Sequence, residues 1–113
     1  MAERSNLADL VMRCYVQVID ERAESKGIKK GDFARRIWPE GTPKASRSRW
    51  LHIRTADAIS GHQQGLLVSD AYKMAQALGE NFSMLMMRAE DLAIRKMEEI
   101  PEDNPKLKRL PNK

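Results

Sequence analysis

The amino-acid sequence predicts an all-α protein of five helices followed by a flexible C-terminal tail. Apolar residues recur at helical spacing, no segment alternates as a strand does, and helix-capping or helix-stopping residues divide the chain at intervals. The 113 residues suffice for one small domain, expected over residues 1–100. Residues 101–113 are mostly polar and hold three prolines, so we expect a tail there.

The first expected helix carries a stripe of seven apolar residues spaced for one helical face. These residues are Leu7, Leu10, Val11, Cys14, Tyr15, Val18 and Ile19. Ser5 or Asn6 is expected to cap the start of this helix, and Gly27 is expected to end it. Cys14 lies within the stripe, which predicts a buried structural thiol. A single cysteine excludes an internal disulfide.

Two further helices are expected in the middle of the chain. The first of them covers about residues 30–37 and stops before Pro39, because the residue before a proline is pushed out of the helical conformation. The second covers about residues 44–54 and turns Trp50 and Ile53 toward the core.

Residues 55–67 contain two glycines and are expected to form a loop. Ser69 is expected to cap a fourth helix, which Gly79 ends. Asn81 or Ser83 is expected to open a fifth helix. Three methionines near the start of this last helix suit core filling, with a protein-binding surface as the alternative. They are Met84, Met86 and Met87.

The positive charge is concentrated in one segment. Residues 26–54 hold nine basic and two acidic residues, a net charge of +7, whereas the whole chain carries +4. A basic block within a folded chain is typical of nucleic-acid binding. An ordinary solvated surface of mixed charge is the alternative interpretation.

Within this block the expected 44–54 helix has the chemistry to enter the major groove of double-stranded DNA. Arginine can contact guanine O6 and N7 bidentately, whereas serine, histidine and lysine contact bases or phosphates. We assign base contact to Arg49 and phosphate contact to Lys30. If the long 38–44 connector rotates the helix, Arg47 takes the reading role. The candidate DNA-binding residues are Lys30, Lys44, Arg47, Ser48, Arg49, His52, Arg54, Gln63 and Gln64.

Two short motifs carry a resemblance to a known family. Phe33-Ala34 lies in the second expected helix, and the segment 74–79 has the pattern Ala-x-x-Leu-Gly before Phe82. Over about residues 27–92 the chain resembles the Cro/C1-type, lambda-repressor-like helix-turn-helix family, although its turn is extended. The resemblance implies a five-helix bundle with the helix-turn-helix motif at about residues 29–54. It further implies a homodimeric transcriptional regulator, a repressor of phage or prophage type, that uses no cofactor.

A second function from another class stays open. The antitoxin of a toxin–antitoxin pair would bind a toxin with one surface and its own operator DNA with another. An enzyme is not expected, because no catalytic constellation occurs. His52, His62 and Cys14 do not have the spacing of a zinc site. With no membrane-spanning segment and no signal peptide expected, the chain is predicted to be cytoplasmic.

Overall fold

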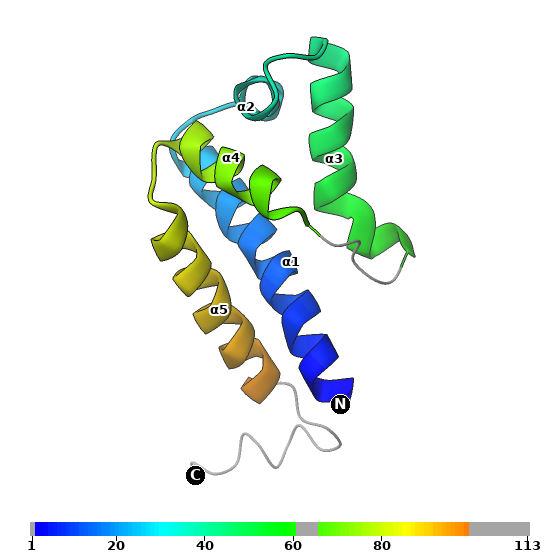
Figure 1. Ribbon diagram of the computed structural model, residues 1–113, viewed down its shortest axis with the longest axis vertical. Helices are drawn as coiled ribbons and strands as arrows, with labels where there is room; N and C mark the ends of the chain where they lie inside the picture. The colour runs from blue at the N-terminus through cyan, green and yellow to red at the C-terminus, as the bar shows by residue number, and fades with distance from the viewer. Residues whose placement is uncertain (1, 61–65, 100–113) are drawn as a thin grey trace.

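The computed structural model describes residues 2–60 and 66–99. Helices are the only regular secondary structure in these residues, and the all-α prediction is confirmed (Figure 1). The helices are α1 (Ala2–Ser25), α2 (Lys30–Ile37), α3 (Pro43–Ser60), α4 (Val68–Leu78) and α5 (Phe82–Glu99). None of these helices is long and apolar enough to cross a membrane. The predicted 101–113 tail lies outside the described residues.

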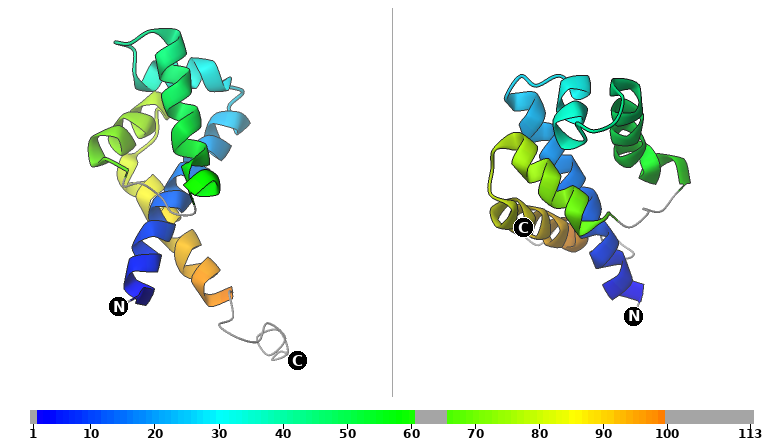
Figure 2. Two further views of the ribbon diagram at one scale, coloured as in Figure 1. Left: turned by 90° about the vertical axis from the view of Figure 1, so that its right-hand side faces the viewer. Right: turned by 45° about the horizontal axis from the view of Figure 1, so that its top comes forward.

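The helices pack around α1. The helix α5 lies beside α1 and runs in the opposite direction, and α4 crosses the upper part of α1 (Figure 1). The helix α2 packs mainly against α3 and α4. Figure 2 shows that α3 and α5 lie on opposite sides of α1. The arrangement therefore leaves α2 and α3 together at one end of the molecule.

The core forms where the predicted apolar face of α1 meets the other helices. Cys14 is 1% exposed, as expected of a structural thiol, and burial raises its pKa against the opposing effect of nearby Lys96 and Arg13. Phe33 of α2 and Trp50 of α3 pack edge to face, with their ring centroids 5.4 Å apart. This aromatic pair joins α2 to α3.

Several predicted helix ends are confirmed. Gly27, two residues after the end of α1, and Gly79, directly after α4, adopt left-handed conformations with φ of 76° and 73°. The Asn81 side chain accepts a hydrogen bond from the Met84 N–H and caps α5. The helix α2 ends at Ile37, two residues before Pro39. These helix ends were therefore predicted correctly from local capping and helix-stopping residues.

Other boundaries were predicted wrongly. The helix α1 begins at Ala2, before the two residues expected to cap it. The helix α3 begins at Pro43, where the Thr42 hydroxyl accepts a hydrogen bond from the Ala45 N–H. It continues to Ser60, so residues 55–60 are helical rather than part of a loop. Ser69 lies inside α4 and caps nothing, since the helix begins at Val68.

The methionine cluster was also predicted wrongly in part. Met84 is 60% exposed and Met87 is 67% exposed, whereas Met86 packs against the core. The inner face of α5 is filled by Leu85, Ala89 and Ala93 instead. Met84 and Met87 are three residues apart and so lie on the same side of the helix.

Candidate nucleic-acid interface

A surface hollow of about 380 Å³ lies where α2 meets α3, and we call it the basic hollow. Four of its lining side chains are cationic, and no carboxylate is among the described residues that line it. The cationic residues are Lys30, Lys44, Arg47 and Arg54. A concave surface that carries a single sign of charge concentrates the field and attracts anions.

The outward direction of these α3 side chains follows from the residues that anchor the helix on its other side. Trp50 is 1% exposed and packs on Phe33. Ser46 is 3% exposed, and its hydroxyl donates a hydrogen bond of 2.8 Å to the Trp38 carbonyl oxygen. Since these two residues face the protein, Lys44 and Arg47 remain exposed.

Arg47 lies against α2 at a position where α2 has no side chain. A Cβ atom added at Gly31 would be 2.9 Å from Arg47 Cδ. The glycine therefore leaves room for the arginine stem. Gly31 is not among the site residues predicted from the sequence. The sequence feature that could have indicated it is a glycine next to Lys30 inside a short helix.

Arg54 is held by an aromatic ring rather than by a carboxylate. Its Cζ lies 5.4 Å from the centroid of the Trp50 ring, which is within the range of a cation–π interaction. Its Nε is buried and has no hydrogen-bond partner among the described residues. The positive charge of Arg54 is therefore not neutralised by an ion pair within the described part of the chain.

Lys30 borders the basic hollow but is already paired. Its Nζ is 3.0 Å from Asp20 Oδ1 on α1. Both side chains are partly exposed, so this ion pair is weak, and another anion can replace Asp20 as the partner of Lys30. Lys30 is the first residue of α2, and its contact with a DNA phosphate stays a prediction.

Arg49 lies in a different environment from the other cations of α3. Its Nη2 is 3.0 Å from Asp70 Oδ2, and its Cζ lies 4.6 Å from the centroid of the Trp38 ring. The Trp38 Nε1 donates a hydrogen bond of 3.2 Å to the other oxygen of Asp70. Arg49 is not among the residues that line the basic hollow. Its guanidinium is directed toward α4, whereas the base contact that we assigned to Arg49 from the sequence requires a side chain directed away from the protein.

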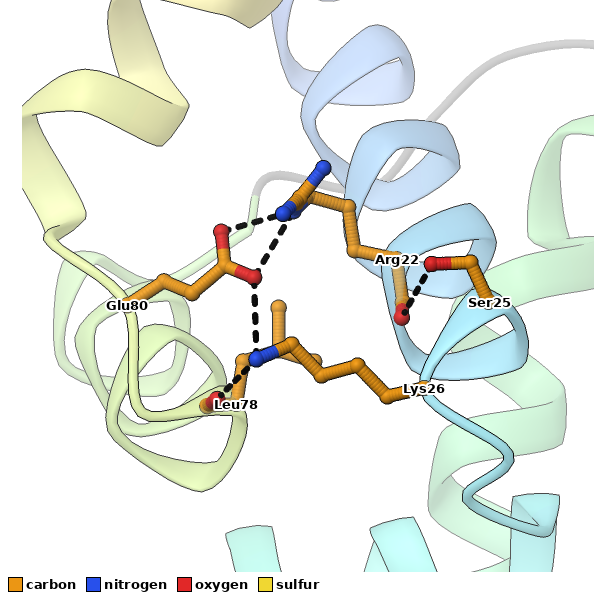
Figure 3. A network of polar contacts seen from close by, with 5 residues as sticks. All are labelled: Arg22, Ser25, Lys26, Leu78 and Glu80. Atoms are coloured by element: carbon orange, nitrogen blue, oxygen red, sulfur yellow. Dashed lines mark hydrogen bonds and ion pairs between the residues drawn. The ribbon is translucent and has the colours of Figure 1, made fainter.

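Lys26, the first cation of the basic block, also has a structural contact. Arg22 and Lys26 both bind the Glu80 carboxylate, and Lys26 donates to the Leu78 carbonyl oxygen (Figure 3). Burial would raise the pKa of Glu80, but the hydrogen bonds and charges of Arg22 and Lys26 outweigh it and hold the pKa below its ordinary value. This cluster fixes the end of α1 to the turn between α4 and α5.

The fold therefore divides the cations of the basic block into those that contact a carboxylate and those that do not. Three of its cations are paired with carboxylates that lie outside the block in sequence. The pairs are Lys26 with Glu80, Lys30 with Asp20, and Arg49 with Asp70. The cations Lys44, Arg47 and Arg54 remain at the basic hollow without a carboxylate contact in the described part of the chain.

The remaining predicted site residues are placed as follows. Ser48 lines the basic hollow, and His52 is exposed on the next turn of α3. Gln63 and Gln64 lie outside the described residues. Within residues 2–60 and 66–99, no group of three or more His, Cys, Asp or Glu side chains is arranged to hold a metal ion.

Comparisons of the chain with protein-family models, with curated proteins and with solved structures found no match.

Proposed function

We propose that this protein is a sequence-specific DNA-binding transcriptional regulator that acts as a repressor. The observation that carries the proposal is the basic hollow, where Lys30 of α2 meets three cations of α3 that have no carboxylate contact in the described part of the chain. In this proposal α2 and α3 form a helix-turn-helix with an extended turn over residues 38–42. Phosphate neutralisation by lysine and arginine supplies most of the affinity of such an interface.

The roles of the individual side chains follow from their placement. Arg47 is exposed on α3 and has no carboxylate partner in the described chain, so we assign base contact to it. Lys30 and Lys44 flank it and suit phosphate oxygens. We assign Arg49 to holding α3 in position, because its guanidinium already binds Asp70.

We further propose that two copies bind a near-palindromic site together. Repressors of this kind place two recognition helices about 34 Å apart, one turn of DNA. The exposed methionines Met84 and Met87 on α5 are the apolar surface that we assign to the contact between copies.

The test of DNA binding starts with selection of bound sequences from a random duplex pool. The selected duplex is then titrated across salt concentrations. If about four to six phosphates are neutralised per monomer, log affinity falls with log salt at a slope of about −4 to −5. Arg47→Gln should weaken binding strongly, whereas Arg95→Gln on the far side of α1 should not. A flat salt dependence, or equal effects of both variants, contradicts the proposal.

A protein-interaction module of the antitoxin type is the second candidate. The exposed Met84 and Met87 favour it, because adaptable apolar side chains suit a protein partner. In that case the purified chain stays monomeric, and a small toxin encoded beside it binds this surface of α5. Sedimentation of the chain alone and with the neighbouring gene product separates the two candidates.

A further inference from the structure

One exposed apolar side chain, that of Leu51 on α3, lies among the cations of the basic hollow. Leu51 is 51% exposed and is not among the described apolar residues that pack against the core. A single exposed leucine is common on a protein surface and needs no explanation by itself. The informative observation is its position, because this apolar side chain lines a hollow whose charged side chains are all cationic within the described residues.

Leu51 is at the centre of the α3 face that lines the hollow. At about 100° per residue, the polar α3 residues that line the hollow all lie within about 60° of Leu51 around the helix axis. These residues are Lys44, Arg47, Ser48 and Arg54. The same periodicity places Arg49 about 160° from Leu51, in agreement with its contact to Asp70 on α4. A ligand that reaches Arg47 from the hollow therefore also meets Leu51.

This combination of cations with a central apolar side chain indicates what the ligand must present. It needs anionic groups for the cations and an apolar group for Leu51. Duplex DNA presents both in its major groove, because phosphates border the groove and thymine carries a 5-methyl group on the base edge. The other three bases present hydrogen-bond donors and acceptors there but no methyl group. Among the four bases, thymine is therefore the one that matches Leu51.

We propose that Leu51 determines specificity by contacting the 5-methyl group of a thymine in the DNA site. The inference rests on the proposed function and adds to it one base that the interface reads. Leu51 follows Arg47 by four residues, which is about 6 Å along the helix axis and less than two base-pair steps of about 3.4 Å each. The thymine therefore lies within about two base pairs of the base that Arg47 contacts.

The test replaces thymine by deoxyuridine, which pairs with adenine in the same way but lacks the 5-methyl group. Each thymine of the duplex selected from the random pool is replaced in turn, and fluorescence anisotropy gives the dissociation constants. The wild type should bind one of the substituted duplexes about fourfold more weakly than the thymine duplex, the effect of one buried methyl group. Leu51→Ala should bind these two duplexes equally, because the alanine side chain is too short to reach the methyl group. Val68→Ala is the matched control and should keep the wild-type ratio, since Val68 is a 72% exposed apolar residue that does not line the hollow.

The ratio of the two dissociation constants separates a contact with the methyl group from a general loss of affinity, because a general loss affects both duplexes alike. The role of Leu51 is overturned if the wild type binds every substituted duplex as tightly as the thymine duplex. It is equally overturned if Leu51→Ala keeps the wild-type ratio, or if Val68→Ala loses it. In these cases the proposed function stands as long as binding still depends on salt and on Arg47. If the wild type binds no duplex, both proposals fail.

Discussion

Arg49 and Asp70 form a salt bridge between an exposed guanidinium and a buried carboxylate. The Asp70 side chain is 8% exposed, and the Arg49 side chain is 49% exposed. The second oxygen of Asp70 accepts a hydrogen bond from Trp38 Nε1. One carboxylate on α4 thus binds the residue that follows α2 and a residue in the middle of α3. The orientation of α3 is set by this contact as well as by Trp50.

Asp70→Ala should therefore destabilise the protein. The substitution leaves the indole N–H of Trp38 buried without an acceptor, which costs about 1–3 kcal/mol. Asp91→Ala is the control, because it removes an exposed pair with Arg95 worth about 0.2–0.5 kcal/mol. Urea denaturation of both variants measures the difference. Equal loss of unfolding free energy in the two variants would show that Asp70 does not hold α3.

Arg47 and Arg49 should differ when each is replaced by alanine. Arg47→Ala exposes no buried group, so stability should be unchanged while the preferred duplex loses about 1–3 kcal/mol of binding free energy at one base position. Arg49→Ala leaves Asp70 buried without its cation, so the free energy of unfolding falls and all duplexes are weakened alike. Denaturation and binding to specific and scrambled duplexes decide between the two roles. A change of base preference in Arg49→Ala alone would restore the assignment made from the sequence.

Gly31→Ala offers a variant that should separate stability from binding. Alanine favours the helix by up to about 1 kcal/mol over glycine, so stability should be kept or raised. The new Cβ would displace the Arg47 stem, which lies 2.9 Å from its position, and DNA affinity should fall. Gly41→Ala is the control, because a Cβ there meets nothing within 4 Å. Unchanged DNA affinity in Gly31→Ala would argue against a role for the Arg47 position observed here.

The sequence predicted the helices well because the signals that define them are local. The spacing of Cys14, Tyr15 and Ile19, the glycines after α1 and α4, and the cap at Asn81 all act within a few residues of the chain. The loop predicted over residues 55–67 was too long, and the sequence signal that was misjudged there is also a local one. Residues 55–60 contain no glycine or proline, and the first helix breaker after Arg54 is Gly61.

The candidate site was predicted less well because its arrangement depends on tertiary contacts. The basic block identified the cations, but no local pattern shows that Asp70, 21 residues after Arg49, will bind it. The same holds for Glu80 and Lys26, which lie 54 residues apart. Helical periodicity predicts which side chains of α3 share a face with Trp50, but it gives no information about which helix lies beside Arg49.

The Glu80 cluster should make stability depend on pH in the acid range. Its pKa is lowered in the folded state, so the ion pairs stabilise the protein at pH values above the ordinary glutamate pKa of about 4.3. This stabilisation is lost as the pH falls through the lower, folded-state pKa. The wild type should therefore exceed Glu80→Gln in unfolding free energy at pH 7, and the difference should shrink below about pH 4. A difference that stays constant from pH 7 to pH 3 would contradict the role of the charge.

The exposed methionines of α5 should determine whether two copies associate. Each buried methionine side chain contributes about 1.5–3 kcal/mol, so the double substitution Met84→Gln and Met87→Gln should weaken a dimer by at least about tenfold. The fold should persist, because both side chains are more than half exposed, whereas Ala89→Gln should unfold the chain by forcing a long polar group against α1. Leu51→Gln, an exposed apolar residue on α3, is the control for a general loss of apolar surface. Sedimentation equilibrium measures the dissociation constant with and without a palindromic duplex. If the double variant dimerises as tightly as the wild type in both conditions, α5 does not form the contact.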